Sequence, residues 1–183
     1  MASLRPAKCY RRIKRAYTRK SKFKKKGYVK AVPNPKITKY NIGNQKGDYK
    51  YRIDLLSKNT IQLRHNAIES VRQSINRHMQ KLFGPQGYYL VVRLYPHHAL
   101  RENKMLSGAG ADRMQTGMSH AFGKVISLAA QLKPNKEIFT VYVPNKPEVV
   151  RGIFQKMASK LPCKIAVNIS TICLLYTSPS PRD

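Results

Sequence analysis

The segment Tyr88-Tyr89-Leu90-Val91-Val92-Arg93-Leu94-Tyr95 has the strongest strand pattern in the sequence. Aromatic and β-branched residues favour extended backbone, and alternate side chains along a strand face opposite sides of a sheet. Leu90, Val92 and Leu94 are therefore predicted to face a hydrophobic core. Pro96, which cannot donate a backbone hydrogen bond, ends the strand. The other predicted elements lie on either side of this strand in the sequence.

Two strands and one helix are predicted before it. The residues from Asp48 to Leu55 alternate between apolar and charged side chains, which predicts a half-buried strand, and a short strand follows at 60–63. Asn66 followed by Glu69 resembles a capping box, which predicts the start of an amphipathic helix, and Gly84 with Pro85 ends it. The apolar face of this helix comprises Ile68, Val71, Ile75, Met79 and Leu82.

Three further elements are predicted toward the C-terminus. Residues 137–143 form a strand, residues 148–161 a second amphipathic helix, and residues 164–169 a last strand. The apolar arc of the second helix comprises Val149, Val150, Ile153, Phe154, Met157 and Leu161. Two helices among about five strands, without strict alternation, predict an α+β fold in which the helices cover a mostly antiparallel sheet in two layers.

The charge of the chain indicates its class of partner. A formal net charge of +28, from 36 Lys and Arg against 8 Asp and Glu, favours a polyanion, and nucleic acid is the first candidate. No run of about 18 apolar residues exists and the N-terminus lacks the apolar core of a secretory signal, so we expect no membrane association and a cytoplasmic location. Cys9, Cys163 and Cys173 lack a paired spacing, which predicts free thiols.

Residues 1–47 are expected to form a basic arm. They contain no Asp or Glu and hold 16 of the 36 basic residues, interleaved with aromatic residues. Such a segment is not expected to fold unaided. It serves either as a solvated tail or localisation signal, or as an arm that threads into RNA with cations on phosphates and rings on bases. The candidate RNA contacts are Arg5, Lys8, Tyr10, Arg11, Arg12, Lys14, Arg15, Tyr17 and Arg19.

Residues 101–124 read as a long Gly-rich loop that leaves the sheet. Loops of this length are commonly functional or disordered, and glycines permit close approach of the backbone to a partner. Basic residues outnumber acids in the loop, which suits an anionic surface. The candidate RNA contacts in and before the loop are Arg93, His97, His98, Arg101, Lys104, Arg113 and Lys124.

No catalytic, metal or cofactor site is expected. Gly108-Ala109-Gly110 lacks the third Gly of a dinucleotide-binding loop, because Arg113 stands at that position. His97 and His98 are adjacent on an extended chain, so they point to opposite sides and favour an RNA-facing corner over one shared site. Isolated Ser and His residues lack an oriented acid partner. The sequence therefore predicts a protein that binds rather than catalyses.

Several motifs together resemble a known family. They are Lys8-Cys9-Tyr10-Arg11, Arg93-Leu94-Tyr95-Pro96-His97-His98, Arg101-Glu102-Asn103-Lys104-Met105, Gly108-Ala109-Gly110-Ala111-Asp112-Arg113, Gly117-Met118 and Ala121-Phe122-Gly123-Lys124. They closely resemble the archaeal and eukaryotic branch (L-ten-e) of the universal L-sixteen family of large-subunit ribosomal proteins, over about residues 3–169. The Arg-Glu-Asn-Lys and Tyr-Pro-His-His forms look archaeal. Val125 stands where the family usually has Pro, so the path after Lys124 stays open.

The resemblance implies a small hammerhead-like α+β domain in the large ribosomal subunit. Its implied partners are large-subunit rRNA, neighbouring ribosomal proteins and nearby tRNA, and no homo-oligomer is expected. The loop is implied to approach the tRNA sites and the catalytic RNA without performing chemistry, which supports translation and subunit maturation. The implied tRNA-proximal residues are Met105, Gly108, Gly110, Ala111, Asp112, Arg113, Gln115 and Gly117.

Two alternatives and one boundary stay open at this stage. A free-standing RNA-binding protein or RNA chaperone would carry the same basic arm, and an RNA-modifying enzyme would need an acid-base or cofactor site that the sequence does not provide. The folded domain is expected to span residues 48–170. Residues 171–183 are expected to be a non-native or disordered tail, because residues 173–183 resemble a translated sequencing adapter or cloning scar.

Overall fold

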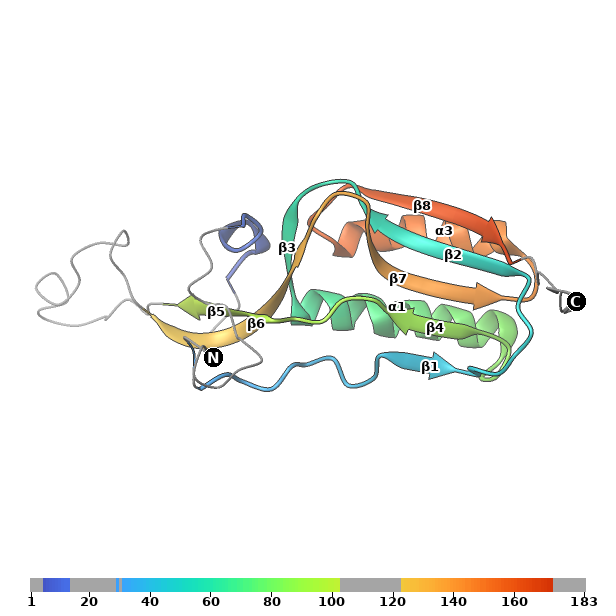
Figure 1. The fold of residues 1–183 in the computed structure, drawn as a ribbon, viewed down its shortest axis with the longest axis horizontal. Coiled ribbons are helices and arrows are strands. Elements are labelled where there is room, and N and C mark those ends of the chain that lie inside the picture. Colours follow the sequence, from blue (N-terminus) through green and yellow to red (C-terminus); the bar gives the residue numbers. More distant parts are fainter. Residues whose placement is uncertain (1–4, 14–28, 30, 103–122, 173–183) are drawn as a thin grey trace, which may run out of the picture.

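The computed structural model describes residues 5–13, 29, 31–102 and 123–172. These residues form two antiparallel sheets and two α-helices (Figure 1). The larger sheet has the strand order β1-β4-β7-β2-β8, and the smaller has the order β3-β6-β5. The strands are β1 (Asn41–Gly43), β2 (Tyr51–Ser57), β3 (Ile61–Arg64), β4 (Tyr89–Val92), β5 (His98–Glu102), β6 (Lys124–Leu132), β7 (Lys136–Val143) and β8 (Ile165–Thr171). The helices are η1 (Ala7–Cys9), α1 (His65–Phe83), α3 (Pro147–Met157) and η3 (Ala158–Lys160).

One long antiparallel ribbon runs through both sheets. In the larger sheet β2 pairs with β7, ending at Ser57↔Lys136, and in the smaller sheet β3 pairs with β6, starting at Ile61↔Leu132. The register is the same on both sides of the bend, and the Asn135 N–H donates to the Ser57 carbonyl at 2.7 Å between the two ladders. The two paired segments curve together from one sheet to the other (Figure 1). We call residues 51–64 and 129–143 the bent ribbon.

Both α-helices cover the same side of the larger sheet (Figure 1). The contact between the helices and this sheet buries most of the apolar surface that stabilises the fold. The side chains of the core are drawn from both helices and from the inward positions of the strands. Those that are fully buried include Ile53, Leu55, Ile68, Ile75, Met79, Tyr88, Leu90, Leu132, Ile138, Phe139 and Phe154. The predicted two-layer α+β arrangement with antiparallel strands is confirmed.

The predicted capping box is wrong. Helix α1 begins at His65 with Arg64 as its N-cap, and no side chain caps it. The Glu69 carboxylate accepts hydrogen bonds from Arg72 and Gln73 instead of reaching back to the first turn. Hydrogen bonding to Arg72 also lowers the pKa of Glu69 below its ordinary value. The predicted end is confirmed, since Gly84 follows the helix with a φ of 72°, which favours glycine.

Two apolar residues do not lie on the faces predicted for them. Leu82 is 46% exposed near the end of α1, and Val149 is 45% exposed in the first turn of α3. Both are near helix ends, where the sheet no longer covers the full apolar arc. The remaining predicted positions of the second helix are buried, and its last predicted residue, Leu161, follows η3.

Two strands of the smaller sheet were not predicted. Strand β4 ends at Val92, but the chain continues into β5, which pairs with β6 from His98↔Ala129 to Glu102↔Lys124. Strand β5 has five residues and strand β6 contains two alanines, so neither shows a clear alternation of apolar and polar side chains. Strand β6 supplies the chain path after Lys124 that the sequence left open. Three residues assigned to the Gly-rich loop, Arg101, Glu102 and Lys124, therefore lie in paired strands.

The predicted domain boundaries are also too narrow. Strand β1 pairs with β4, and Ile37 belongs to the main core, although both precede residue 48. The apolar residues before residue 48 are widely spaced among many charged residues. The sequence therefore showed no clear periodic pattern there. At the other end, Thr171 pairs with Tyr51 and the Ile172 N–H donates to the Lys50 carbonyl, so the sheet extends beyond residue 170. Residues 173–183 lie outside the described residues.

Neighbouring valines in α3 provide a test of the core. Val150 is fully buried and Val149 is 45% exposed. We expect Val150→Ala to lower the free energy of unfolding by about 2 kcal/mol, since it removes two buried methyl groups and leaves a small cavity. Val149→Ala should change it by less than about 0.5 kcal/mol. Urea unfolding monitored by circular dichroism measures both. Equal losses would contradict the assigned orientation of α3.

Candidate nucleic-acid interface

The N-terminal segment 5–11 docks on the smaller sheet. The Gln62 N–H donates to the Arg11 carbonyl at 2.9 Å, and the Gln62 side-chain amide donates to the Tyr10 carbonyl, also at 2.9 Å. Gln131 in turn donates to Oε1 of Gln62 at 3.3 Å. Strand β3 is an edge strand of its sheet, so these contacts satisfy polar groups that an edge would otherwise leave to solvent.

Glu102 holds the side chains of the same segment. Its carboxylate accepts a hydrogen bond from Nε of Arg5 at 2.9 Å and one from the Tyr10 hydroxyl at 3.3 Å. Burial raises the pKa of the Tyr10 phenol above its ordinary value, and the Glu102 carboxylate beside it adds to the shift. The Arg64 guanidinium lies over the Tyr10 ring, 5.4 Å from the ring centroid. Arg5 and Tyr10, predicted as RNA contacts, thus act here as intramolecular anchors.

The docked segment and Arg12, directly after it, present three exposed cations. Lys8, Arg11 and Arg12 are exposed, while the backbone between them is held by Gln62. Exposed cations on an anchored backbone lose less conformational freedom on binding than cations on a mobile chain. The chemistry available to them is charge-assisted hydrogen bonding to phosphate oxygens. Lys124, at the start of β6, is also exposed.

Arg93 belongs to an ion-pair network on the sheet face opposite the helices. It donates to the Thr140 hydroxyl and the Tyr142 hydroxyl, both at 3.1 Å, and lies 3.5 Å from Glu137. Arg52 bridges the same Glu137 and Asp54, and the Thr140 hydroxyl donates to Asp54 at 2.7 Å. Two arginines and two carboxylates cancel in charge. Arg93 is therefore a weaker phosphate contact than its isolated position in the sequence suggests.

The structure does not bring the two predicted histidines together at one site. The His97 ring packs on Tyr95 with their centroids 4.7 Å apart, and Tyr95 stacks on Tyr40 at 5.7 Å. His98 instead begins β5 opposite Ala129. Arg101, three residues later, donates to the Gly123 carbonyl at 3.4 Å. The pair His97-His98 thus contributes one exposed ring and one strand residue.

The other predicted contacts fall in segments 14–19 and 104–117 of the sequence. Lys14, Arg15, Tyr17, Arg19, Lys104, Met105, Gly108, Gly110, Ala111, Asp112, Arg113, Gln115 and Gly117 lie outside the described residues. Within the described ranges, no group of three or more His, Cys, Asp or Glu residues gathers in a way that could hold a metal ion. No helix in those ranges is long and apolar enough to cross a membrane.

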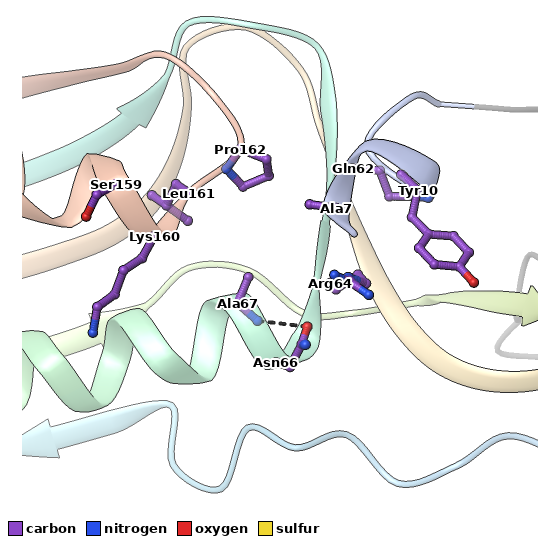
Figure 2. Close-up of a pocket in the computed structure, with 10 residues that line it drawn as sticks. All are labelled: Ala7, Tyr10, Gln62, Arg64, Asn66, Ala67, Ser159, Lys160, Leu161 and Pro162. Atoms are coloured by element: carbon purple, nitrogen blue, oxygen red, sulfur yellow. Dashed lines mark hydrogen bonds between the residues drawn. The ribbon is translucent and has the colours of Figure 1, made fainter. Parts of the chain in front are cut away.

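Sequence reasoning missed a pocket beside the docked segment. It has a volume of about 330 Å³ and lies where η1, β3, the start of α1 and the chain around η3 meet (Figure 2). Its lining residues are Ala7, Tyr10, Gln62, Arg64, Asn66, Ala67, Ser159, Lys160, Leu161 and Pro162. These residues come from three distant parts of the chain. Only the folded structure could reveal the pocket.

Glu102 provides a test of the docking. We expect Glu102→Gln to increase amide exchange in residues 5–11 severalfold, because the neutral amide binds Arg5 and the Tyr10 hydroxyl more weakly than the carboxylate does. Hydrogen exchange read by mass spectrometry measures this. Glu148→Gln is the matched control, since Glu148 pairs with Arg151 at an exposed site on α3. Unchanged exchange in residues 5–11 of the Glu102 variant would contradict the anchoring role.

Comparison with known proteins identifies the family. A profile of ribosomal protein L16p/L10e matches residues 14–168. The chain is 44% identical to large ribosomal subunit protein uL16 of Methanococcus maripaludis over 169 residues, which cover 90% of this chain and 94% of that protein. It is 44% identical to uL16 of Staphylothermus marinus over 161 residues, covering 87% and 89%, and 41% identical to uL16 of Sulfolobus acidocaldarius over 174 residues, covering 92% and 95%. The chain therefore belongs to the archaeal branch of the ribosomal protein L16p/L10e family.

Proposed function

We propose that this chain is a structural constituent of the large ribosomal subunit that binds large-subunit rRNA and performs no chemistry itself. The observation that carries the proposal is the family match, which covers residues 14–168, together with relatives named as large ribosomal subunit proteins. The net charge of +28 supports a polyanionic partner. In this role the protein would work in the cytoplasm among neighbouring ribosomal proteins.

The rRNA contact is proposed to begin at the docked N-terminal segment. Lys8 and Arg11 are exposed on this held backbone, and the exposed Arg12 directly follows it. The arm between residues 14 and 30 adds many further basic residues. Each phosphate that the arm neutralises releases counterions, so affinity should depend strongly on salt. Anchoring is thus spread over many contacts of moderate strength.

Residues 101–124 are proposed to approach the peptidyl-transferase region and the tRNA sites. Support comes from the base of this segment, where Glu102 pairs with Lys124 and Arg101 with Val125. The residues that flank the segment therefore lie side by side in paired strands of the smaller sheet. Its glycines suit close approach to RNA rather than packing in a core. Through this segment the protein would support translation and the maturation of the subunit.

Paired variants separate anchoring from function. We expect Arg113→Ala and Gly110→Val to leave the occupancy of the protein in large subunits nearly unchanged and to reduce peptide synthesis per occupied subunit severalfold. Arg11→Ala combined with Arg12→Ala should lower occupancy first, and should reduce the salt slope of RNA binding by about 1.5, since each phosphate contact contributes about 0.7 to 0.9. The measurements are quantitative mass spectrometry of purified subunits and synthesis of a reporter peptide.

The controls are the unmodified chain and the surface variant Val149→Ala. A loop variant that lowers occupancy and synthesis in the same proportion would show that the loop only anchors the protein. If the unmodified chain instead sediments apart from large subunits after a high-salt wash, the ribosomal assignment itself is wrong and a free-standing RNA-binding protein is favoured.

A further inference from the structure

The pocket beside the docked segment is open to a ligand from outside. One wall is η1, which contributes Ala7, and the opposite wall is the turn after η3, which contributes Leu161 and Pro162 (Figure 2). Strand β3 and the first turn of α1 form the base. Its volume of about 330 Å³ lies at the lower end of the range for small-molecule sites, roughly 300 to 1,000 Å³. That size suits a single nucleotide and excludes a duplex.

The charge in the pocket has one sign. Its ionisable lining residues are Arg64, Lys160 and the uncharged phenol of Tyr10, and neither Asp nor Glu is among the ten residues that line it. Directly behind the lining, burial and the charges of Lys36 and Arg64 lower the pKa of His65, and Nδ1 of His65 accepts the Lys36 N–H at 3.3 Å. Burial, with Lys36 and Arg64 adding to it, thus disfavours the charged form of His65. An anionic occupant would lie beside two positive charges.

Arg64 is the residue best placed to bind a phosphate. Its guanidinium lies over the Tyr10 ring, and Tyr10 is fixed by Glu102. A guanidinium stacked on a ring keeps its in-plane N–H groups free to form paired hydrogen bonds with phosphate oxygens. Lys160, at the far end of the pocket, donates to the Ser74 hydroxyl on α1 and adds positive charge without closing the pocket.

The rest of the lining suits a base or sugar. Ala7, Ala67, Leu161 and Pro162 offer small apolar surfaces. The Gln62 side-chain amide donates to the Tyr10 carbonyl and accepts a hydrogen bond from Gln131. Gln62 therefore lines the pocket without binding the ligand. Oδ1 of Asn66 accepts the Ala67 N–H at 3.0 Å, while its amide nitrogen has no partner among the described residues and can donate to an acceptor on a base.

We propose that this pocket holds one unpaired nucleotide of an RNA strand, with its phosphate on Arg64 and its base or sugar against Ala7, Ala67 and Pro162. The inference rests on the proposed rRNA-binding function and names a specific contact within it. Recognition of unpaired nucleotides in pockets is common in RNA binding, because their bases are free to leave the stack. The pocket exists only while segment 5–11 is docked, so Glu102 and Gln62 position one of its walls.

The test compares two variants that add the same charge to the first turns of α1. Ala67→Glu places a carboxylate in the pocket, and Ser70→Glu places one at an exposed position outside it. The probes are a short single-stranded RNA and a fully paired RNA duplex, each bound to the full chain and followed by fluorescence anisotropy. We expect Ala67→Glu to weaken single-strand binding about tenfold, the scale of one charged hydrogen bond, and Ser70→Glu to change it less than about twofold. Duplex binding should change equally in both variants.

Arg64→Lys provides a second variant that keeps the charge of the site. It should also weaken single-strand binding, because an ammonium lacks the paired N–H donors, and it decides the question if Ala67→Glu fails to fold. Equal effects of Ala67→Glu and Ser70→Glu, or preferential binding of an acidic peptide or of inorganic phosphate at the pocket, would overturn the proposal while leaving rRNA binding intact. Failure of the unmodified chain to bind either RNA would overturn the proposed function together with it.

Discussion

The bent ribbon formed by residues 51–64 and 129–143 is the constraint on which the rest of the structure depends. Backbone pairing continues from the larger sheet into the smaller one, with one register shift between Leu55 and Leu56, and it fixes the position of the smaller sheet relative to the helix-covered core. Strand β4 pairs with β7 and strand β5 pairs with β6, so β7 and β6 each have a neighbouring strand on both sides. The docked N-terminal segment contacts the smaller sheet. Strands β5 and β6, which flank residues 103–122, belong to the same sheet. Both proposed RNA-facing regions are thereby attached to one scaffold.

The acidic residues of this strongly basic chain serve mainly to organise its arginines. Of the six acidic residues that the structure describes, five form an ion pair with an arginine, namely Asp54, Glu69, Glu102, Glu137 and Glu148. Partly buried pairs of this kind contribute more to specificity of arrangement than to net stability. Glu102 shows the consequence most clearly, since it converts Arg5 from a phosphate contact into an anchor. The lysines and remaining arginines on the surface are then available to an outside polyanion.

The sequence was sufficient for the elements whose periodicity is long and regular, and insufficient where contacts between distant segments decide the structure. The alternation around Leu90 and the helical spacing around Ile75 predicted the core, because both reflect burial on one face. Strand β5 was missed because its five residues depend on pairing with β6 for their conformation. At the candidate interface, the charge identified the exposed cations near Arg11. It could not reveal the pocket at Arg64, whose walls are separated by about 150 residues in the sequence.

The central claim is that the bent ribbon makes the two sheets one cooperative unit. Native-state hydrogen exchange of the full chain under increasing denaturant tests it most directly, because it reports the opening free energy of each strand. The account predicts that the amides of β3 and β6 share the opening free energy of β2 and β7 and exchange only with global unfolding. A smaller sheet that opens at a clearly lower free energy than β2 and β7 would contradict it, since the docked segment and the loop base would then lack a fixed support.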